Sequence, residues 1–298
     1  MNRVDSWRNI LEALAKAVPI AMLTFVVSSM LAVGLSLTVR EIVTPLRNGK
    51  LLTLAVLANF VLMPLAAILI ARVLQLEQPL GVALLILGAA AGAPFLPKLA
   101  SVAEGNLAFS VGLMVLLMVL TVGYMPVVLP LLLQGVEVDP MQIARSLVVL
   151  MLLPLLFGLV VRARAATIAG RVVPWLNRLS SVSLALMMVL MVVTNARSIV
   201  SLFGTRGIFA SIVFLLVGVA VGWLLGGSTR DVKSVLALGT AQRNIAAALV
   251  VGGQNFDDPT VVVMVTVVAI VGLGLLMPLA RQLSKSTQQP RAESFQTP

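Results

Sequence analysis

The chain has 298 residues, 60% of them hydrophobic and 11% charged, and its mean hydropathy is +1.09. Because a soluble domain of this length does not need so much apolar surface, the composition indicates a polytopic membrane protein. The chain contains no cysteine and no histidine, which excludes disulfides, thiolate metal sites and histidine-based catalysis, so we do not expect an enzyme. The formal net charge is +10, and its basic residues stand at the ends of apolar segments, which fits membrane orientation better than nucleic-acid binding.

Nine apolar segments follow one another along the chain, and a helix of about 20 apolar residues crosses the hydrocarbon core. We therefore predict an all-α protein with about nine transmembrane helices. Their limits are roughly 18–38, 51–73, 80–104, 108–134, 142–162, 175–197, 207–227, 232–252 and 258–280.

The two ends of the chain differ from these segments. Residues 4–16 carry apolar side chains on one face, which predicts an interfacial helix within residues 1–17. Residues 282–298 are polar and lack periodicity, which predicts a disordered tail. Residues 1–281 are then expected to form a single transmembrane domain.

An odd number of helices places the two ends of the chain on opposite sides of the membrane. Of the basic residues outside the membrane segments, seven belong to the N-terminal segment and the loops after even-numbered helices. Twelve belong to the other loops and the C-terminal segment. Since the side richer in basic residues is usually cytoplasmic, we predict an external N-terminus and a cytoplasmic C-terminus, in the plasma (inner) membrane.

Two of the nine segments contain residues that interrupt a membrane helix. The third contains LGAAAGAPFLPK (87–98), with two glycines and two prolines, and a proline inside a helix costs about 3 kcal/mol. The eighth contains LGTAQRN (238–244), with a guanidinium where a lipid-facing leucine is expected. Irregular backbone is not tolerated against lipid, so both breaks must be buried in protein or line a wet cavity.

The two interrupted segments also occupy corresponding positions. Each runs from a Leu-Gly pair through small residues to a second glycine followed by amide residues, and then to a long apolar helix. If the chain contains a repeat with an offset of five helices, the third segment corresponds to the eighth. Because five is an odd number, the second copy of the repeat is inverted in the membrane relative to the first. Paired interrupted helices in inverted repeats are typical of secondary transporters. The alternative is that these glycines and prolines serve only packing or kinks.

Three stretches resemble the bile acid:sodium symporter family, namely GLSLTVREIVTPLRNGKLLTLAVLANFVLMPLAAILIARVL (34–74), AEGNLAFSV (103–111) and AQRNIAAALVV (241–251). The resemblance implies ten helices, or nine when the first is missing. It also implies a panel domain that faces a core domain in which two discontinuous helices cross. Members of the family carry bile acids, other steroid conjugates and smaller organic anions, driven by two sodium ions.

The sodium ligands that the resemblance implies are mostly missing here. The Ser-Asn pair of the family's first broken helix falls on Leu96 and Pro97. The glutamate and glutamine of its second broken helix fall on Gly239 and Arg243, and only the following asparagine is kept, as Asn244. Sodium needs several hard oxygens and gains from a carboxylate, whereas a nearby guanidinium repels it. We therefore predict that these positions bind no sodium or other metal.

Arg243 suggests what replaces the ion. A buried arginine costs about 2.5–3.5 kcal/mol on insertion scales, so its presence needs a compensating role. We predict that it supplies permanently the positive charge that bound sodium gives the family, facing an anionic substrate. The alternative is a structural arginine that pairs with backbone carbonyls at the C-terminus of a half-helix, or with an acid such as Glu104.

Six further residues are predicted to line the substrate site beside Arg243. They are Asn244, Gln242, Thr240, Asn59, Pro94 and Lys98. For the amides and the hydroxyl, a hydrogen bond between helices is a close alternative, and for Lys98 we favour a structural role.

The sequence thus predicts a secondary carrier of organic anions that works by alternating access, with the lipid bilayer and a small anion as partners and without cofactors. Because no histidine or acidic residue titrates inside the membrane, exchange or uniport is more natural than proton coupling. The alternatives are a conventional sodium-coupled symporter and a membrane receptor that does not transport. The substrate, the direction of transport and the oligomeric state are left open.

Overall fold

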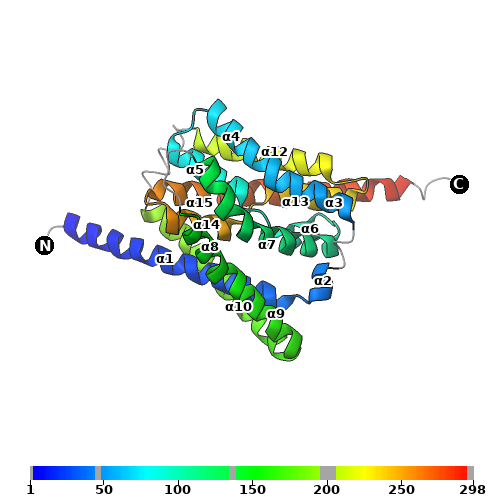
Figure 1. The fold of residues 1–298 in the computed structure, drawn as a ribbon, viewed down its shortest axis with the longest axis horizontal. Coiled ribbons are helices and arrows are strands. Elements are labelled where there is room, and N and C mark those ends of the chain that lie inside the picture. The colour runs from blue at the N-terminus through cyan, green and yellow to red at the C-terminus, as the bar shows by residue number, and fades with distance from the viewer. Residues whose placement is uncertain (1–2, 44–47, 134–138, 195–205, 294–298) are drawn as a thin grey trace.

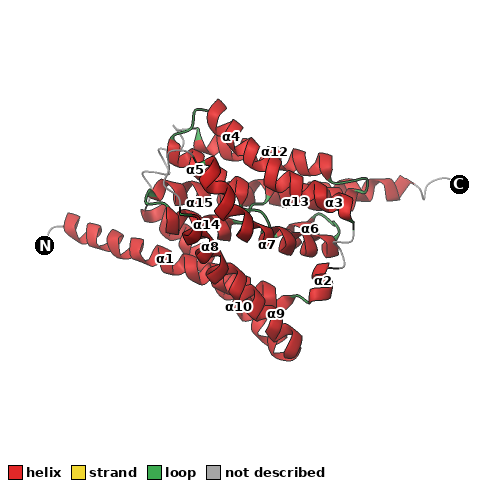
Figure 2. Ribbon diagram, viewed as in Figure 1, coloured by secondary structure: helices red, strands yellow, loops and turns green. Residues whose placement is uncertain are grey.

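The computed structural model describes residues 3–43, 48–133, 139–194 and 206–293, and every regular element in these ranges is a helix (Figures 1 and 2). The elements are α1 (Arg3–Ser36), α2 (Val39–Val43), α3 (Gly49–Leu57), η2 (Ala58–Leu62), α4 (Met63–Val73), α5 (Gln78–Ala89), α6 (Leu96–Val102), α7 (Leu107–Leu132), α8 (Pro140–Leu147), η3 (Val148–Leu152), α9 (Leu153–Arg164), α10 (Ala166–Thr194), α12 (Gly207–Leu225), α13 (Arg230–Ala241), α14 (Ile245–Asn255) and α15 (Pro259–Glu293).

The predicted class, an all-α polytopic membrane protein, is confirmed. In the described part of the chain, eight helical stretches are long and apolar enough to cross a membrane. The predicted span that is missing from these eight, 80–104, is present as two shorter helices, α5 and α6. The reason is the backbone between them, which leaves the helix at Ala90 and turns through Gly92 with a φ of +78°. An L-residue rarely adopts that conformation, so glycine is needed there.

The second predicted interruption is also present. Helix α13 ends at Ala241 and α14 begins at Ile245, with Asn244 as the N-cap residue that accepts a hydrogen bond from the Ala247 N–H. The most apolar 18-residue part of Arg230–Asn255 is 94% buried, although its mean hydropathy is only 1.4. A broken helix with polar residues is therefore kept inside the protein and away from lipid.

The helices form two bodies, which we call the panel and the core. The panel consists of α1 together with the chain from α8 to α10, and α1 packs along both α9 and α10. The core consists of the helices from α3 to α7 and from α12 to α15. In Figure 1 the panel runs obliquely beneath the core. The panel meets the core where α8 packs on α7 and α14, and where the short helix α2 lies against α7.

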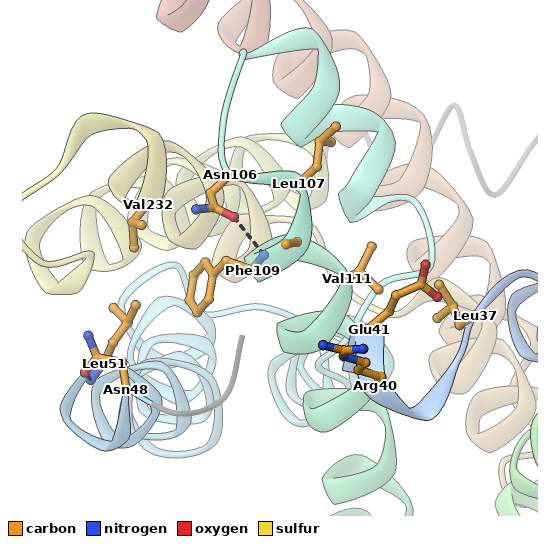
Figure 3. Close-up of a pocket in the computed structure, with 11 residues that line it drawn as sticks. Leu37, Arg40, Glu41, Asn48, Leu51, Asn106, Leu107, Phe109, Val111 and Val232 are labelled. Carbon is orange, nitrogen blue, oxygen red and sulfur yellow. Dashed lines mark hydrogen bonds between the residues drawn. The ribbon is translucent and has the colours of Figure 1, made fainter. Parts of the chain in front are cut away.

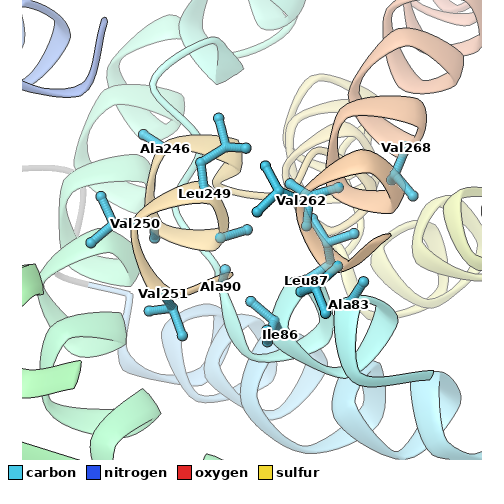
Figure 4. Close-up of a cluster of buried hydrophobic side chains, with 14 of the residues drawn as sticks. Ala83, Ile86, Leu87, Ala90, Ala246, Leu249, Val250, Val251, Val262 and Val268 are labelled. Carbon is cyan, nitrogen blue, oxygen red and sulfur yellow. The ribbon is translucent and has the colours of Figure 1, made fainter. Parts of the chain in front are cut away.

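The two broken helices pack against each other and against α15 in the centre of the core. Figure 4 shows this contact as a set of small and branched side chains, among them Ala83 and Ile86 of α5, Ala246 and Leu249 of α14, and Val262 of α15. In a membrane such contacts are stabilised by close packing rather than by expulsion of water, which favours small residues.

Glycines bring α12 close to α13 on the other side of the second broken helix. A Cβ atom added at Gly218 would lie 2.7 Å from the Ala241 Cα, and one added at Gly222 would lie 2.3 Å from the Leu236 carbonyl oxygen. Glycine at these positions therefore lets α12 cover the polar segment at backbone contact distance.

A π-helical turn interrupts the helix that precedes the first break. It covers Ala58–Leu62 and ends two residues before Pro64, whose ring nitrogen has no hydrogen to donate. The α-helical partner of the Phe60 carbonyl would be the N–H of residue 64, so this carbonyl loses its usual hydrogen bond. The turn frees backbone oxygens that face the crossing of the broken helices.

The ends of the chain continue their neighbouring helices. Helix α1 is continuous from Arg3, so residues 4–16 belong to the same helix as the first membrane span. Helix α15 continues to Glu293, and residues 294–298 lie outside the described part. The interfacial position of the first segment and the disorder of the tail stay predictions.

Candidate functional site

The breaks in the two half-helix pairs meet in the core. The Asn244 N–H donates to the Ala90 carbonyl at 2.9 Å, and the Asn244 side-chain amide donates to the Gly92 carbonyl at 3.1 Å. The same side chain caps α14 by accepting from Ala247. Asn244 thus joins the two interrupted segments and starts one of the half-helices, which places this predicted residue at the crossing itself.

Arg243 lies at the centre of the crossing and is almost completely buried, with 1% of its surface exposed. A guanidinium has five N–H donors, and each has an acceptor here. The contacts are Nε to the Leu87 carbonyl at 2.8 Å, Nη1 to the Asn59 Oδ1 at 2.8 Å and to the Thr240 carbonyl at 3.0 Å, and Nη2 to the Gly88 carbonyl at 2.7 Å and to the Asn59 carbonyl at 3.5 Å.

These acceptors come mainly from helix ends. Leu87 and Gly88 stand in the last turn of α5, and Thr240 stands in the last turn of α13, where backbone carbonyls lack partners within their own helix. The C-terminus of a helix also carries about half a negative charge, so two helix ends favour a cation between them. Arg243 therefore caps both first half-helices.

The acceptors of Arg243 are amide oxygens, mostly of the backbone. This agrees with one of the two structural alternatives to a substrate-binding role, the one in which the arginine pairs with carbonyls at the end of a half-helix. The other alternative, a pair with Glu104, does not agree with the geometry. Glu104 is exposed at the end of α6, and its carboxylate accepts a hydrogen bond from the Ser284 hydroxyl at 2.9 Å. Since all five donors of Arg243 are in use, its guanidinium has none left to hold a substrate carboxylate in this structure.

Asn59 holds the guanidinium from the side of α3 and η2. Its Oδ1 accepts from Arg243, while its Nδ2 donates to the Ala55 carbonyl at 3.0 Å and to the Thr240 hydroxyl at 3.3 Å. Asn59 and Thr240 are both fully buried. The predicted residues Asn59, Thr240, Arg243 and Asn244 thus form one continuous hydrogen-bond network.

Three predicted residues lie outside this network. Gln242 is partly buried in the second break, and Pro94 is partly buried in the first. Lys98 is exposed on α6. Within the described residues, the side chains of Gln242 and Lys98 make no hydrogen bond with another residue.

Two residues of α7 support the site and were not singled out by the sequence. The Thr121 hydroxyl accepts from the Ala91 N–H at 3.0 Å and donates to the Ala91 carbonyl at 3.1 Å, which fixes the first break. The Tyr124 hydroxyl donates to the Phe60 carbonyl, the one that Pro64 leaves without a helical partner, and the two rings lie 4.7 Å apart. Hydroxyl groups in an otherwise apolar helix were the available signal, since a hydroxyl that leaves water needs a partner.

Hydrocarbon fills the crossing at Leu96 and Gly239, two positions where the resemblance implies sodium ligands. A Cβ atom added at Gly239 would lie 2.9 Å from the Leu96 Cδ2 and 3.7 Å from the Leu113 Cδ2. Leu96 is 1% exposed, so its side chain occupies the space beside Gly239. The two residues face each other across the crossing, and neither has a side-chain oxygen.

A pocket of about 710 Å³ lies between the panel side of the molecule and the core, at the end where α7 and α13 begin (Figure 3). Its lining is largely apolar, with Leu51, Phe109 and Val232 among the contributors, and its charged members are Arg40 and Glu41. Figure 3 shows the hydrogen bond by which Asn106 caps α7, which measures 2.9 Å to the Phe109 N–H.

The two charges in this pocket are not equivalent. The Glu41 carboxylate accepts from the Thr38 backbone N–H at 2.7 Å and from the Thr38 hydroxyl at 2.8 Å. These hydrogen bonds, first that of the side chain and then that of the backbone, hold the pKa of Glu41 below its usual value, so Glu41 stays ionised. Arg40 has no such partner among the described residues and offers the pocket a free guanidinium.

The role of Thr121 can be measured against a matched threonine. Replacing Thr121 by valine keeps the shape but leaves the Ala91 N–H and carbonyl unpaired, which we expect to destabilise the protein by about 2–4 kcal/mol. Thr266 is equally buried, but its hydroxyl bonds only to the Val262 carbonyl of its own helix, so Thr266→Val should change stability by less than about 1 kcal/mol. Melting temperatures in detergent compare the two, and equal values would contradict the role given to Thr121.

Comparison with known proteins agrees with this architecture. The model of the Sodium Bile acid symporter family matches residues 22–202, which is more than half of the chain and includes the first broken helix. A search of the curated proteins gives no match. Arg243 and the second broken helix lie outside the matched range. With nine predicted spans, a panel, a core and two interrupted helices that cross, the chain belongs to the sodium bile acid symporter family.

Proposed function

We propose that the protein is a secondary transporter of organic anions in which the guanidinium of Arg243 takes the place of a bound cation at the crossing of the broken helices. The family supports the coarse part of this proposal, a transporter in a membrane rather than an enzyme. The observation that carries the finer part is that all five N–H groups of a buried Arg243 are bonded to oxygens that converge on the crossing.

The convergence of oxygens supports a cation at this place. A small metal cation takes five or six oxygens as ligands, and backbone carbonyls are among the commonest. Here the carbonyls come from the ends of α5 and α13 and from η2, all of which direct negative potential at one point. The planar guanidinium matches several such oxygens at once, whereas the ammonium of a lysine would present only a point charge.

The apolar contact between Leu96 and Gly239 supports the absence of sodium from the neighbouring position. Sodium there would need oxygen ligands, and the space is filled by the leucine side chain. A tethered guanidinium also cannot dissociate, so it cannot couple transport to an ion gradient. We therefore favour exchange or uniport of the anion. Coupling through sodium bound at other backbone oxygens is the alternative mechanism.

The pocket between panel and core supports an organic anion as the transported molecule. Its volume of about 710 Å³ lies in the range of small-molecule sites, and its apolar walls and Arg40 suit a molecule with a hydrocarbon body and an acidic group. The same lining would also suit a receptor that binds such a molecule without moving it, which is the third alternative.

We place the N-terminus outside and the end of the molecule with this pocket in the cytoplasm, because the loops at that end carry more basic residues. The chain has no cysteine, so a single introduced thiol reports its own side of the membrane. On intact cells, an impermeant thiol reagent should label Glu77→Cys, at the exposed start of α5, and should label Ser228→Cys only after permeabilisation. The reverse pattern would invert the orientation.

Transport is tested in liposomes that contain the purified protein. Labelled taurocholate, a sulfated steroid and a small carboxylate are each supplied outside, with or without the same unlabelled anion inside. A carrier gives saturable uptake that internal anion accelerates, and the rate should be equal in sodium and in potassium. A rate that requires sodium would restore the coupled symporter. Binding without any uptake would identify a receptor.

Arg243 is tested by its effect on stability. In detergent, the wild-type melting temperature should be the same in sodium, potassium and choline at matched ionic strength. Arg243→Gln leaves the converging carbonyls without their cation, which we expect to cost about 3–5 kcal/mol, and added sodium should recover part of the loss.

Two further variants act as controls for this substitution. Arg72→Gln removes an exposed arginine at the end of α4 and should leave the melting temperature nearly unchanged. Arg243→Lys keeps a positive charge and should lose less stability than Arg243→Gln. Sodium-specific stabilisation of the wild-type protein would show that Arg243 does not replace the ion.

A further inference from the structure

Lys98 is a charged residue of the broken helices that the crossing does not use. It stands in the first turn of α6, two residues after Leu96, and it is exposed. Within the described chain its ammonium group has neither a hydrogen-bond partner nor an ion-pair partner. A free charge in a membrane segment is costly, so its surroundings decide what it does.

Lys98 lies close to the crossing in depth. The Leu96 side chain touches the backbone at Gly239 in the crossing, and Lys98 is about 3 Å further along the helix axis, at 1.5 Å for each residue. Side chains of a helix lean toward its N-terminus, which for α6 is the end at the crossing. The Cα–Cβ bond of Lys98 therefore tilts toward the end of α6 that lies at the crossing.

The exposed face of α6 is polar. Its buried residues, Leu96, Leu99 and Ala100, face the core, where α6 packs on α7, α13 and α15. Lys98 and Ser101 stand on the opposite face at a spacing of three residues, so their side chains are neighbours. A helix face turned to lipid at this depth is expected to be apolar, and a face with an amine and a hydroxyl indicates water.

We infer that Lys98 lines a water-filled approach to the crossing and binds the acidic group of the transported anion there, with the Ser101 hydroxyl as its neighbour. The inference rests on the proposed function and divides two roles between two cations. Arg243 neutralises the helix ends and is held by their carbonyls, whereas Lys98 is free to bind a carboxylate, sulfonate or sulfate. An ammonium group suits this role because its three donors rotate with the ligand.

The rival explanation is that the lysine extends along the membrane to the headgroups while its backbone faces lipid. A cysteine separates the two explanations, because it is too short to reach the surface. The chain contains no other thiol, so Ser101→Cys can be treated alone with two methanethiosulfonate reagents of similar size, one anionic and one cationic. The rate at which each reagent modifies the cysteine is divided by its rate with a free thiol in solution, which corrects for the different reactivity of the two reagents.

We expect Ser101→Cys to react, and to prefer the anionic reagent by about three- to tenfold because of the adjacent ammonium. The preference should disappear in Ser101→Cys with Lys98→Gln and persist in Ser101→Cys with Lys98→Arg. Val119→Cys, on an exposed apolar part of α7, is the control for a lipid-facing position and should not react. No reaction at residue 101, or a preference that Lys98→Gln leaves unchanged, would overturn the inference.

This test needs no substrate, so it separates the inference from the proposed function.

A second measurement tests the role of Lys98 together with the proposed function. An anion that raises the melting temperature of the wild-type protein should lose that effect in Lys98→Gln and keep most of it in Lys98→Arg. Without any anion, Lys98→Gln should melt at the same temperature as the wild-type protein, because the lysine side chain has no partner to lose. If taurocholate, the sulfated steroid and the small carboxylate neither stabilise nor cross, the proposed function fails. If one of them stabilises Lys98→Gln as well as wild type, the role of Lys98 fails.

Discussion

The structure depends on the need of one buried guanidinium for five hydrogen-bond acceptors. Inside a membrane protein, an unpaired N–H of a charged group costs several kcal/mol, and an intact helix offers its side chains no free carbonyls. Acceptors become available only where helices end. The interruptions of α5 and α13 bring two such ends to the same place, and Arg243 bonds to both. The buried charge therefore depends on the breaks in the helices, and in turn it neutralises the helix ends that the breaks create.

The surrounding polar residues follow from the same need. Pro64 and the π-helical turn before it release carbonyls of η2, and one of these accepts from Arg243 while the next accepts from Tyr124. Asn59 adds a side-chain oxygen and is itself oriented by Thr240. A network of this kind is stable when every member is satisfied, and it then fixes one arrangement of the helices.

The sequence was sufficient to predict the spans, the two interruptions and the position of Arg243 in the second of them, because glycine, proline and arginine are conspicuous in apolar segments. It also left open the pairing of Arg243 with half-helix carbonyls, which the structure contains. It could not identify Thr121 or Tyr124 as partners, because their hydrogen bonds join residues 30 and 64 positions apart. The acceptors of Arg243 are mostly backbone oxygens, which every residue has, so no sequence pattern marks them.

The positive charge at the crossing is covalently attached to the chain, which distinguishes the proposed carrier from one that binds a cation from solution. A carrier that borrows its cation from solution has an ion-free form, in which the crossing loses its central charge and the two broken helices are held less firmly. In this protein the charge is part of the chain, so the five hydrogen bonds that join Arg243 to the broken helices do not depend on an ion from solution. In the proposed carrier, the central charge therefore does not set the direction of net flow, which follows from the electrochemical gradient of the anion.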